Sequence, residues 1–412
     1  MAEIAYKVDK CRICGEPLPP AVMSLGGQTL ANNLIEAPSS VEPVVLLDLT
    51  ACRQCKLVQL TRVVNSDVLF RNYLYAPGFS PTFQQHFKDL AEDATRSMGG
   101  GLAVDIGSND GTLLSKFKDL GWVVAGIEPS EVQARQARAV GIMTLHDYWG
   151  PLARQWVEGH YGKADVITAT NVFAHVDNIQ GFVEQVQRLL KPEGVFILEV
   201  PYLYSMFTGG TWDMIYHEHL SYFHMTPLKH LFEANHLRIA ATQVVPIHGD
   251  SLRVWVQHSD ASVPLLSGFG RDVLLDKEAS TSVVEDLTQF GLDCTQKRDE
   301  VREYVYKTVA MGKRVVGYTA PAKATVLINY CGFTSYHIEY IVDDSPLKVG
   351  RFLPGSNIPV VSSSRLEEAP PDVIVVFAWN VVHDILPKLP PNAKVITAMP
   401  RLKEWTRALA AA

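Results

Sequence analysis

Apolar runs that end in polar residues or glycine recur along the chain, and they alternate with stretches of helical periodicity. The run at 102–106 ends just before Gly107, and the stretch from Thr112 to Phe117 then has the pattern of a helix. A helical pattern over 82–98 precedes this pair. Further strand-like runs follow at 122–127, 164–170, 194–199 and 252–256. Such alternation predicts a doubly wound α/β sheet.

A second α/β unit is predicted after a long charged helical pattern from about Ser282 to Met311. Lys323 lies just inside a helix that begins near Pro321, a layout that suits an anionic phosphate at the helix N-terminus. A pyrophosphate-bearing ligand is the favoured interpretation, and a purely structural partner domain is the alternative. Strand ends and loops are expected to bring further polar residues to the same edge, namely Tyr318, Asp343, Lys348, Arg351 and Asn380.

The turn after the run at 102–106 has the features of a nucleotide-binding loop. Gly107 lets a ligand approach the backbone, and the helix behind it offers unsatisfied N–H donors. The turn lacks G-x-G-x-x-G and G-x-x-x-x-G-K-[ST], which disfavours a phosphate-bearing ligand. An ordinary strand–helix turn is the alternative to a hydroxyl-rich, cationic ligand such as S-adenosylmethionine. The side chains that favour that ligand are Asp105, Asn109, Asp110 and Glu128, the last at a strand end that can face ribose hydroxyls.

Four of the six cysteines form two C-x-x-C pairs, Cys11 with Cys14 and Cys52 with Cys55. Tetrahedral Zn²⁺ needs two such pairs, so the spacing predicts a structural zinc site closed by four thiolates. The pairs are unusually far apart, and the apolar run at 44–49 between them suggests a small sheet. Two disulfides are the alternative, disfavoured because the chain shows no secretory signal.

Four titratable side chains occupy consecutive positions 216–219, flanked by aromatic residues. Burying such a group is costly, so one member is predicted to be a general base. A solvated polar loop is the alternative. A metal site at His217, Glu218 and His219 is disfavoured because no pair has the i, i+4 spacing of H-E-x-x-H.

Other candidates follow from position alone. Asn171 and His175 come directly after the run at 164–170, at the edge where such sheets bind ligands, although a histidine satisfied by backbone is the alternative for His175. Tyr202 stands at another strand end, and Tyr75 lies shortly before the central sheet, where packing is its alternative role. His248 enters a late strand through a glycine turn, where a solvated hairpin is the alternative.

Composition narrows the class of protein. With 412 residues, 47% hydrophobic and 20% charged, the chain is expected to form two or three globular domains. A net charge of −7 without a basic block argues against nucleic acid as the main partner. No run approaches the roughly 18 uncharged apolar residues of a membrane span. We therefore expect a cytoplasmic monomer with neither nucleic acid nor membrane as a partner.

Several motifs together resemble one family. They are the two C-x-x-C pairs, D-I-G-S-N-D-G with E-P-S, Y-H-E-H, H-G-x-S-L-R, G-Y-x-A-x-A-K and F-A-W-N, in this order over nearly the whole chain. This series is similar to that of S-adenosylmethionine-dependent nucleotide-sugar C-methyltransferases, which make branched deoxysugars. The resemblance implies a zinc-binding domain at 1–75, a Rossmann-like methyltransferase domain at 76–285, and a second Rossmann-like α/β domain at 286–412 that holds the nucleotide.

The resemblance also assigns roles. It implies a nucleotide-linked 4-keto-6-deoxysugar, usually carried by thymidine diphosphate, as the substrate. We hypothesise that His219 takes the proton from the sugar C3, that Tyr216 or a nearby hydroxyl hydrogen-bonds the ketone oxygen, and that Glu218 orients His219. Tyr75 is a weaker catalytic match, and Tyr202 and His248 join the C-terminal residues as substrate contacts. The cofactor set is Asp105, Gly107, Ser108, Asn109, Asp110, Glu128, Pro129, Asn171 and His175; the zinc set is Cys11, Cys14, Cys52 and Cys55.

Two positions depart from the family pattern. Thr319 stands where a second glycine is frequent, and Asp250 stands where glycine often follows His-Gly. These departures leave the sugar and the nucleotide open. An O- or N-methyltransferase acting on a nucleotide sugar is the alternative enzyme, and a non-catalytic nucleotide-sugar-binding protein is the alternative from another class.

Overall fold

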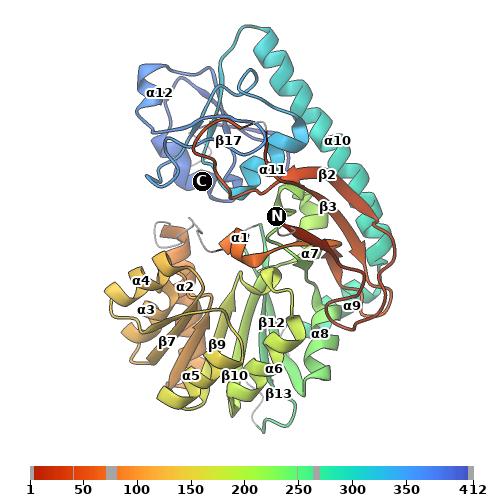
Figure 1. The fold of residues 1–412 in the computed structure, drawn as a ribbon, viewed down its shortest axis with the longest axis vertical. Coiled ribbons are helices and arrows are strands. Elements are labelled where there is room, and N and C mark those ends of the chain that lie inside the picture. The colour runs from red at the N-terminus through yellow and green to blue at the C-terminus, as the bar shows by residue number, and fades with distance from the viewer. Residues whose placement is uncertain (1–3, 40, 71–80, 248, 263–269, 407–412) are drawn as a thin grey trace.

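A computed structural model describes residues 4–39, 41–70, 81–247, 249–262 and 270–406. A large mixed sheet with flanking helices forms one end of the molecule (Figure 1). A smaller α/β sheet forms the other end, and the N-terminal strands with the long helix α10 (Val283–Ala310) run along one side. No helix in the described part of the chain is both long and apolar enough to cross a membrane.

The large sheet has seven strands in the order β12-β13-β10-β9-β6-β7-β8. All are parallel except β13, which runs antiparallel between β10 and β12. The order matches a doubly wound sheet with one antiparallel strand inserted near its end, so the predicted α/β fold is confirmed. The strands are β6 (Leu102–Ile106), β7 (Val123–Glu128), β8 (Thr144–His146), β9 (Ala164–Thr170), β10 (Leu190–Pro201), β12 (Leu237–Val245) and β13 (Ser251–His258).

Amphipathic helices cover this sheet. In α2 (Pro81–Met98), Phe83, Phe87 and Leu90 recur at helical spacing and are buried in one cluster with Phe117 and Trp255. Because one face of the helix is apolar, it packs on the sheet and carries the chain into β6. The other helices of this part are α3 (Thr112–Asp119), α4 (Glu131–Ala139), α5 (Pro151–Tyr161), α6 (Ile179–Leu189), α7 (Leu203–Gly209), α8 (Met225–Ala234), α9 (Arg271–Ala279), and the 3₁₀ turns η2 (Phe173–His175) and η3 (Trp212–Met214).

The N-terminal part contains the small sheet expected between the cysteine pairs. Its strand order is β11-β4-β3-β2, and β1 pairs separately with β5. Strand β11 (Ser221–Tyr222) comes from the central part of the chain and begins two residues after His219, so this sheet anchors the end of the predicted catalytic run. The other elements are β1 (Ala5–Lys7), β2 (Met23–Thr29), β3 (Val44–Ala51), β4 (Val58–Leu60), β5 (Arg62–Val64) and α1 (Ser66–Phe70).

The C-terminal part is a second α/β unit, which follows α10 in the chain. Its strand order is β16-β15-β14-β17-β18-β19, and all pairs are parallel except β18 with β19. Its elements are β14 (Val315–Tyr318), α11 (Ala322–Cys331), β15 (Ile341–Val342), β16 (Val360–Val361), α12 (Arg365–Glu368), β17 (Val373–Val376), η4 (Trp379–Val381), α13 (Val382–Ile385), η5 (Leu386–Lys388), β18 (Lys394–Thr397) and β19 (Lys403–Trp405).

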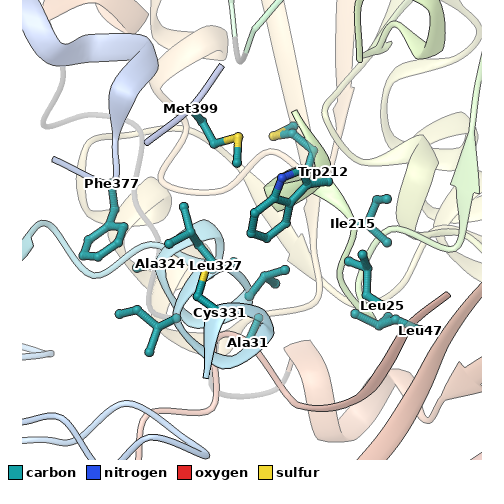
Figure 2. Packing of buried hydrophobic residues seen from close by; sticks show 14 of the residues in the cluster. Leu25, Ala31, Leu47, Trp212, Ile215, Ala324, Leu327, Cys331, Phe377 and Met399 are labelled. Carbon is teal, nitrogen blue, oxygen red and sulfur yellow. The ribbon is translucent and has the colours of Figure 1, made fainter. Parts of the chain in front are cut away.

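One buried cluster joins the three parts. Figure 2 shows Leu25 and Leu47 of the N-terminal sheet near Ile215, while Trp212 lies beside Leu327 and its neighbours on α11. Trp212 is fully buried, and an aromatic side chain of this size contributes a large apolar area. The cluster holds the 212–216 segment against both flanking parts, which places the predicted catalytic run between them.

Candidate active site

A cavity of about 1060 Å³ lies where the three parts meet. Its size suits a drug-sized or larger ligand. The carboxyl ends of β6, β7 and β9 form one wall, the 214–220 segment a second, and the loops after β14 and β17 a third. The predicted site residues on its walls are Asp105, Gly107, Ser108, Asn109, Asp110, Glu128, Pro129, Asn171, His175, Tyr216, His219, Lys323, Asp343, Lys348 and Asn380.

The predicted cofactor loop needs glycine at 107. Its φ is +71°, and a Cβ built there would lie 2.3 Å from Cγ2 of Val172. A larger residue would be strained by its backbone and would also clash with the wall of the cavity. Glycine therefore allows the strand β6 to turn tightly into α3.

The acidic residues of this edge shape the loop. Glu128 accepts hydrogen bonds from the N–H groups of Asn109 at 2.9 Å and Ser130 at 2.7 Å. Burial raises the pKa of Glu128, and the two backbone donors oppose that rise. Asp110 accepts from the backbone N–H and the hydroxyl of Thr112 at the start of α3. The expected contact of Glu128 with ribose hydroxyls stays a prediction. The two backbone N–H groups hold the Glu128 carboxylate in position for such a contact.

Asp105 is buried at the end of β6. Burial raises the pKa of its carboxyl to about 7, and the Thr168 hydroxyl, which donates to it at 2.7 Å, opposes the rise. Asp105 is only 2% exposed. It lines the cavity near the loop, so a cationic ligand there would favour its charged form.

The predicted catalytic run forms a tight turn. The His219 N–H donates to the Tyr216 carbonyl at 2.9 Å, which brings residues 216 and 219 together. His219 Nδ1 lies 2.9 Å from the Met214 carbonyl oxygen, so this nitrogen carries the hydrogen. In the neutral ring Nε2 then accepts from the Tyr216 hydroxyl at 2.8 Å. The pair is thus a phenol beside a basic imidazole nitrogen at the cavity wall.

A second histidine flanks this pair. The His175 ring lies edge-on to the His219 ring, with centroids 5.1 Å apart. Burial lowers the pKa of His175 to about 4, and a hydrogen bond that its ring donates to the Asn171 backbone opposes the shift. A neutral His175 adds no positive charge that would lower the basicity of His219.

Glu218 does not lie where the sequence suggested. Both of its carboxylate oxygens accept from Asn32 Nδ2, at 2.7 and 2.8 Å, while the Met214 carbonyl and the Tyr216 hydroxyl bond the two ring nitrogens of His219. The cause is the turn, in which the first and fourth residues meet and the third faces elsewhere. Asn32 lines the cavity and was missed, because it lies 186 positions from Glu218 and belongs to no motif.

The C-terminal wall contributes cations. Lys323 is buried at the start of α11, with Nζ 3.0 Å from Asn380 Oδ1 and 4.6 Å from the centre of the Trp379 ring. Burial lowers its pKa to about 8, and the negative charge of Asp213 opposes that shift. Lys348 Nζ bonds the Ala320 carbonyl at 3.0 Å and Asp343 at 3.3 Å.

Three predicted substrate contacts lie outside the cavity lining. Tyr202 donates its hydroxyl to Glu278, Tyr318 donates to Asp344, and Arg351 donates to the Leu34 carbonyl. Strand alternation explains Tyr318, the last residue of β14, since a strand end fixes the edge that a residue occupies but not the face of its side chain. Tyr202 follows the end of β10 and precedes the first residue of α7. Tyr75 and His248 lie outside the described residues.

The four predicted zinc ligands form one cluster. Their sulfur atoms all lie within 4.8 Å of one another, and the pairs Cys11–Cys55 and Cys14–Cys52 are 3.4 Å apart. Tetrahedral Zn²⁺ with Zn–S bonds of about 2.3 Å separates its sulfurs by about 3.8 Å, so the donor set fits this metal.

The cysteine cluster is attached to the catalytic run through Arg12. The guanidinium donates to the carbonyl of Leu220 at 3.2 Å and to Asp177 at 3.0 Å. Leu220 follows His219 directly, and Leu220 and Asp177 both line the cavity. The first cysteine knuckle is therefore tied to the wall of the site.

Two known methyltransferases are similar to part of the chain. A ubiquinone biosynthesis O-methyltransferase of Burkholderia ambifaria is 32% identical over 110 residues, which cover 25% of this chain and 45% of that protein. The structure of a magnesium protoporphyrin IX methyltransferase from Synechocystis PCC 6803 with bound SAM aligns with a TM-score of 0.32 and 15% identity, over 42% of this chain and 78% of that one.

Family models cover most of the chain. Residues 11–70 match a "putative zinc binding domain", residues 85–242 a methyltransferase domain, and residues 246–400 a C-methyltransferase C-terminal domain. Together with the Rossmann-like sheet, these matches define an S-adenosylmethionine-dependent methyltransferase. The C-methyltransferase NovU of Streptomyces niveus is 33% identical over 391 residues, which cover 94% of this chain and 93% of that protein. The chain belongs to this C-methyltransferase family.

Proposed function

We propose that the enzyme transfers the methyl group to C3 of a nucleoside-diphosphate 4-keto-6-deoxysugar, with thymidine diphosphate as the expected carrier, in branched deoxysugar biosynthesis. The observation that carries the proposal is the Tyr216–His219 pair, which faces a cavity with the cofactor loop on one wall and buried Lys323 on another. A base, a methyl donor and an anion can then meet around one substrate.

The chemistry follows from the target atom. A carbon becomes a nucleophile only when its negative charge is delocalised, and a neighbouring ketone provides this as an enolate. We propose that the Tyr216 hydroxyl turns its hydrogen from His219 Nε2 to the ketone oxygen when the substrate binds, which frees Nε2 and stabilises the developing charge on that oxygen. The C3–H bond then breaks, its electron pair enters the enolate, and His219 Nε2 takes the proton.

S-adenosylmethionine, when bound, would supply an electrophilic methyl group on a sulfonium. The enolate carbon would take this methyl group as the methyl–sulfur bond breaks, which would leave a neutral thioether. Asp105, Glu128 and the loop from Gly107 to Asp110 are the proposed cofactor contacts. Zn²⁺ on the four cysteines is proposed to be structural, because four thiolates leave no open coordination position.

Hydrogen exchange at the substrate tests the enolate step. In D₂O without a methyl donor, the wild-type enzyme is expected to introduce deuterium at C3 of the ketosugar, because the base works before methyl transfer. An enzyme that methylates the sugar on oxygen and exchanges no C3 hydrogen would instead be the O-methyltransferase alternative. Mass spectrometry of the recovered sugar measures the exchange.

Replacement of Lys323 by alanine is expected to weaken nucleotide binding about ten- to a hundredfold, since a charged hydrogen bond contributes about 1.5–3 kcal/mol. Affinity for S-adenosylmethionine should stay unchanged. Arg351→Ala is the matched control, because Arg351 lies outside the cavity lining. Calorimetry with thymidine diphosphate measures the nucleotide affinity of both variants. Equal effects of the two substitutions would show that the nucleotide binds elsewhere.

Nucleotide affinity should also depend on pH. The pKa of Lys323 is lowered to about 8 by burial, and only the ammonium form attracts a diphosphate. Affinity is therefore expected to be constant between pH 6 and 7 and to fall as the pH rises from about 8, the pKa of Lys323 in the free protein, towards the higher pKa that the anion gives it in the complex. The Lys323→Met variant should lack this fall; a wild-type affinity that is constant up to pH 10 would contradict the assignment.

A further inference from the structure

Asn32 brings a side chain from the N-terminal part to the catalytic turn. Its Nδ2 donates to both oxygens of Glu218, which is only 2% exposed. A carboxylate accepts hydrogen bonds, so the NH₂ side of the planar amide faces Glu218 and the carbonyl oxygen Oδ1 is directed away from it. Asn32 also lines the cavity, as do Tyr216 and His219. It therefore offers the cavity a hydrogen-bond acceptor whose orientation is set by Glu218.

The backbone around Asn32 is fixed by the C-terminal part. The Thr325 hydroxyl donates to the Ala31 carbonyl at 2.8 Å, and Asn329 Nδ2 donates to the Thr29 hydroxyl at 3.0 Å. Both donors lie on α11, the helix that begins beside Lys323, and Figure 2 shows Ala31 packed near Cys331 of that helix. On the other side, Ile35 and Phe352 exchange backbone hydrogen bonds at 3.0 and 2.8 Å. Asn32 is thus held between the catalytic turn and the proposed nucleotide wall.

We propose that Asn32 is a specificity-determining residue, whose Oδ1 accepts a hydrogen bond from a ring hydroxyl of the sugar substrate. This inference rests on the proposed function. A substrate that spans from Lys323 to the Tyr216–His219 pair places its sugar ring along the wall that Asn32 lines. A hydroxyl donates to a carbonyl oxygen, whereas a keto oxygen or a methylene does not, so Asn32 favours a hydroxylated ring over its deoxy counterpart.

Glu218 has a defined part in this arrangement as a positioning residue. Burial raises its pKa to about 7, and the hydrogen bond from Asn32 opposes the rise. In its ionised form the buried carboxylate keeps the amide from turning over, because a reversed amide would place the acceptor Oδ1 against another acceptor. Substitution of Asn32 by serine retains one donor for Glu218 but removes the carbonyl acceptor, while alanine removes both.

The test compares sugars within each variant. Nucleotide-linked ketosugars are prepared in pairs that differ by one ring hydroxyl, and kcat/KM is measured for the wild type, Asn32→Ser, Asn32→Ala and the control Asn33→Ala. Asn33 is exposed and adjacent, and it does not line the cavity. The ratio of kcat/KM within a pair is independent of the fraction of folded enzyme, so a stability loss in a variant does not obscure the result.

For one pair, the preference of the wild type for the hydroxylated sugar is expected to fall about tenfold in both Asn32 variants and to stay unchanged in Asn33→Ala. Unchanged ratios in every pair would overturn the role of Asn32 while leaving the methyl transfer intact. If the wild-type enzyme methylated none of these sugars, that result would instead contradict the proposed function on which the inference rests.

Discussion

His219→Asn is expected to lower kcat by about 10²- to 10⁴-fold, the range that general acid–base catalysis contributes. Asparagine can keep a contact with the Met214 carbonyl, but it has no basic nitrogen to accept the C3 proton. Substrate and cofactor should still bind, because the loop after β6 and the Lys323 region are unaltered. Steady-state kinetics at saturating concentrations measures the loss, and calorimetry measures binding of both ligands.

His217→Asn is the matched control for this substitution. His217 lies in the same turn and is buried, with Nε2 at 3.0 Å from the Val45 carbonyl, but it does not line the cavity. This variant should be less stable and yet retain a kcat within a few-fold of the wild type per folded molecule. If His219→Asn kept near-full turnover while both ligands bound, the base would have to be a different residue.

Loss of the metal is expected to have the second large effect. Zn²⁺ binding is worth about 10–16 kcal/mol in small zinc-folded peptides, so Cys52→Ser should release the ion and destabilise the N-terminal part severely. Activity should fall together with metal content, because Arg12 joins the first cysteine knuckle to Leu220 and Asp177 at the cavity wall.

Elemental analysis, thermal unfolding and kinetics on the same preparation separate these effects. Cys294→Ala is the control, since Cys294 is buried in the apolar core and lies outside the four-cysteine cluster. It should retain a full equivalent of zinc. A Cys52→Ser enzyme with stoichiometric zinc and wild-type melting temperature would show that the cysteines do not form the proposed site.

Much of the fold could be predicted because local patterns determine it. The strand at 164–170 and the long helix near 282–311 agree with β9 and α10, since apolar periodicity reports burial directly. The apolar run that starts at Val373 continues in the sequence to Trp379, but β17 ends at Val376 and Trp379 begins the 3₁₀ turn η4. The residue at which a strand ends depends on tertiary contacts, which an apolar pattern in the sequence does not report.

The site was predictable only where a motif lies within one segment. The Tyr216–His219 pair and the loop from Gly107 to Asp110 are each local, and both line the cavity. Asn32 meets Glu218 across 186 positions, a contact created by packing of the N-terminal part against α11. Arg351 was grouped with Lys348 because the two are close in the chain. In the structure the Arg351 guanidinium donates to the Leu34 carbonyl and does not line the cavity.

The position of the transferred methyl group tests the central claim most directly. The enzyme is incubated with S-adenosylmethionine labelled with ¹³C in its methyl group and with a panel of nucleotide-linked 4-keto-6-deoxysugars, and the products are analysed by NMR. The account predicts a labelled methyl carbon bonded directly to C3 of the sugar. A label on oxygen or nitrogen, or no transfer to any ketosugar of the panel, would contradict it.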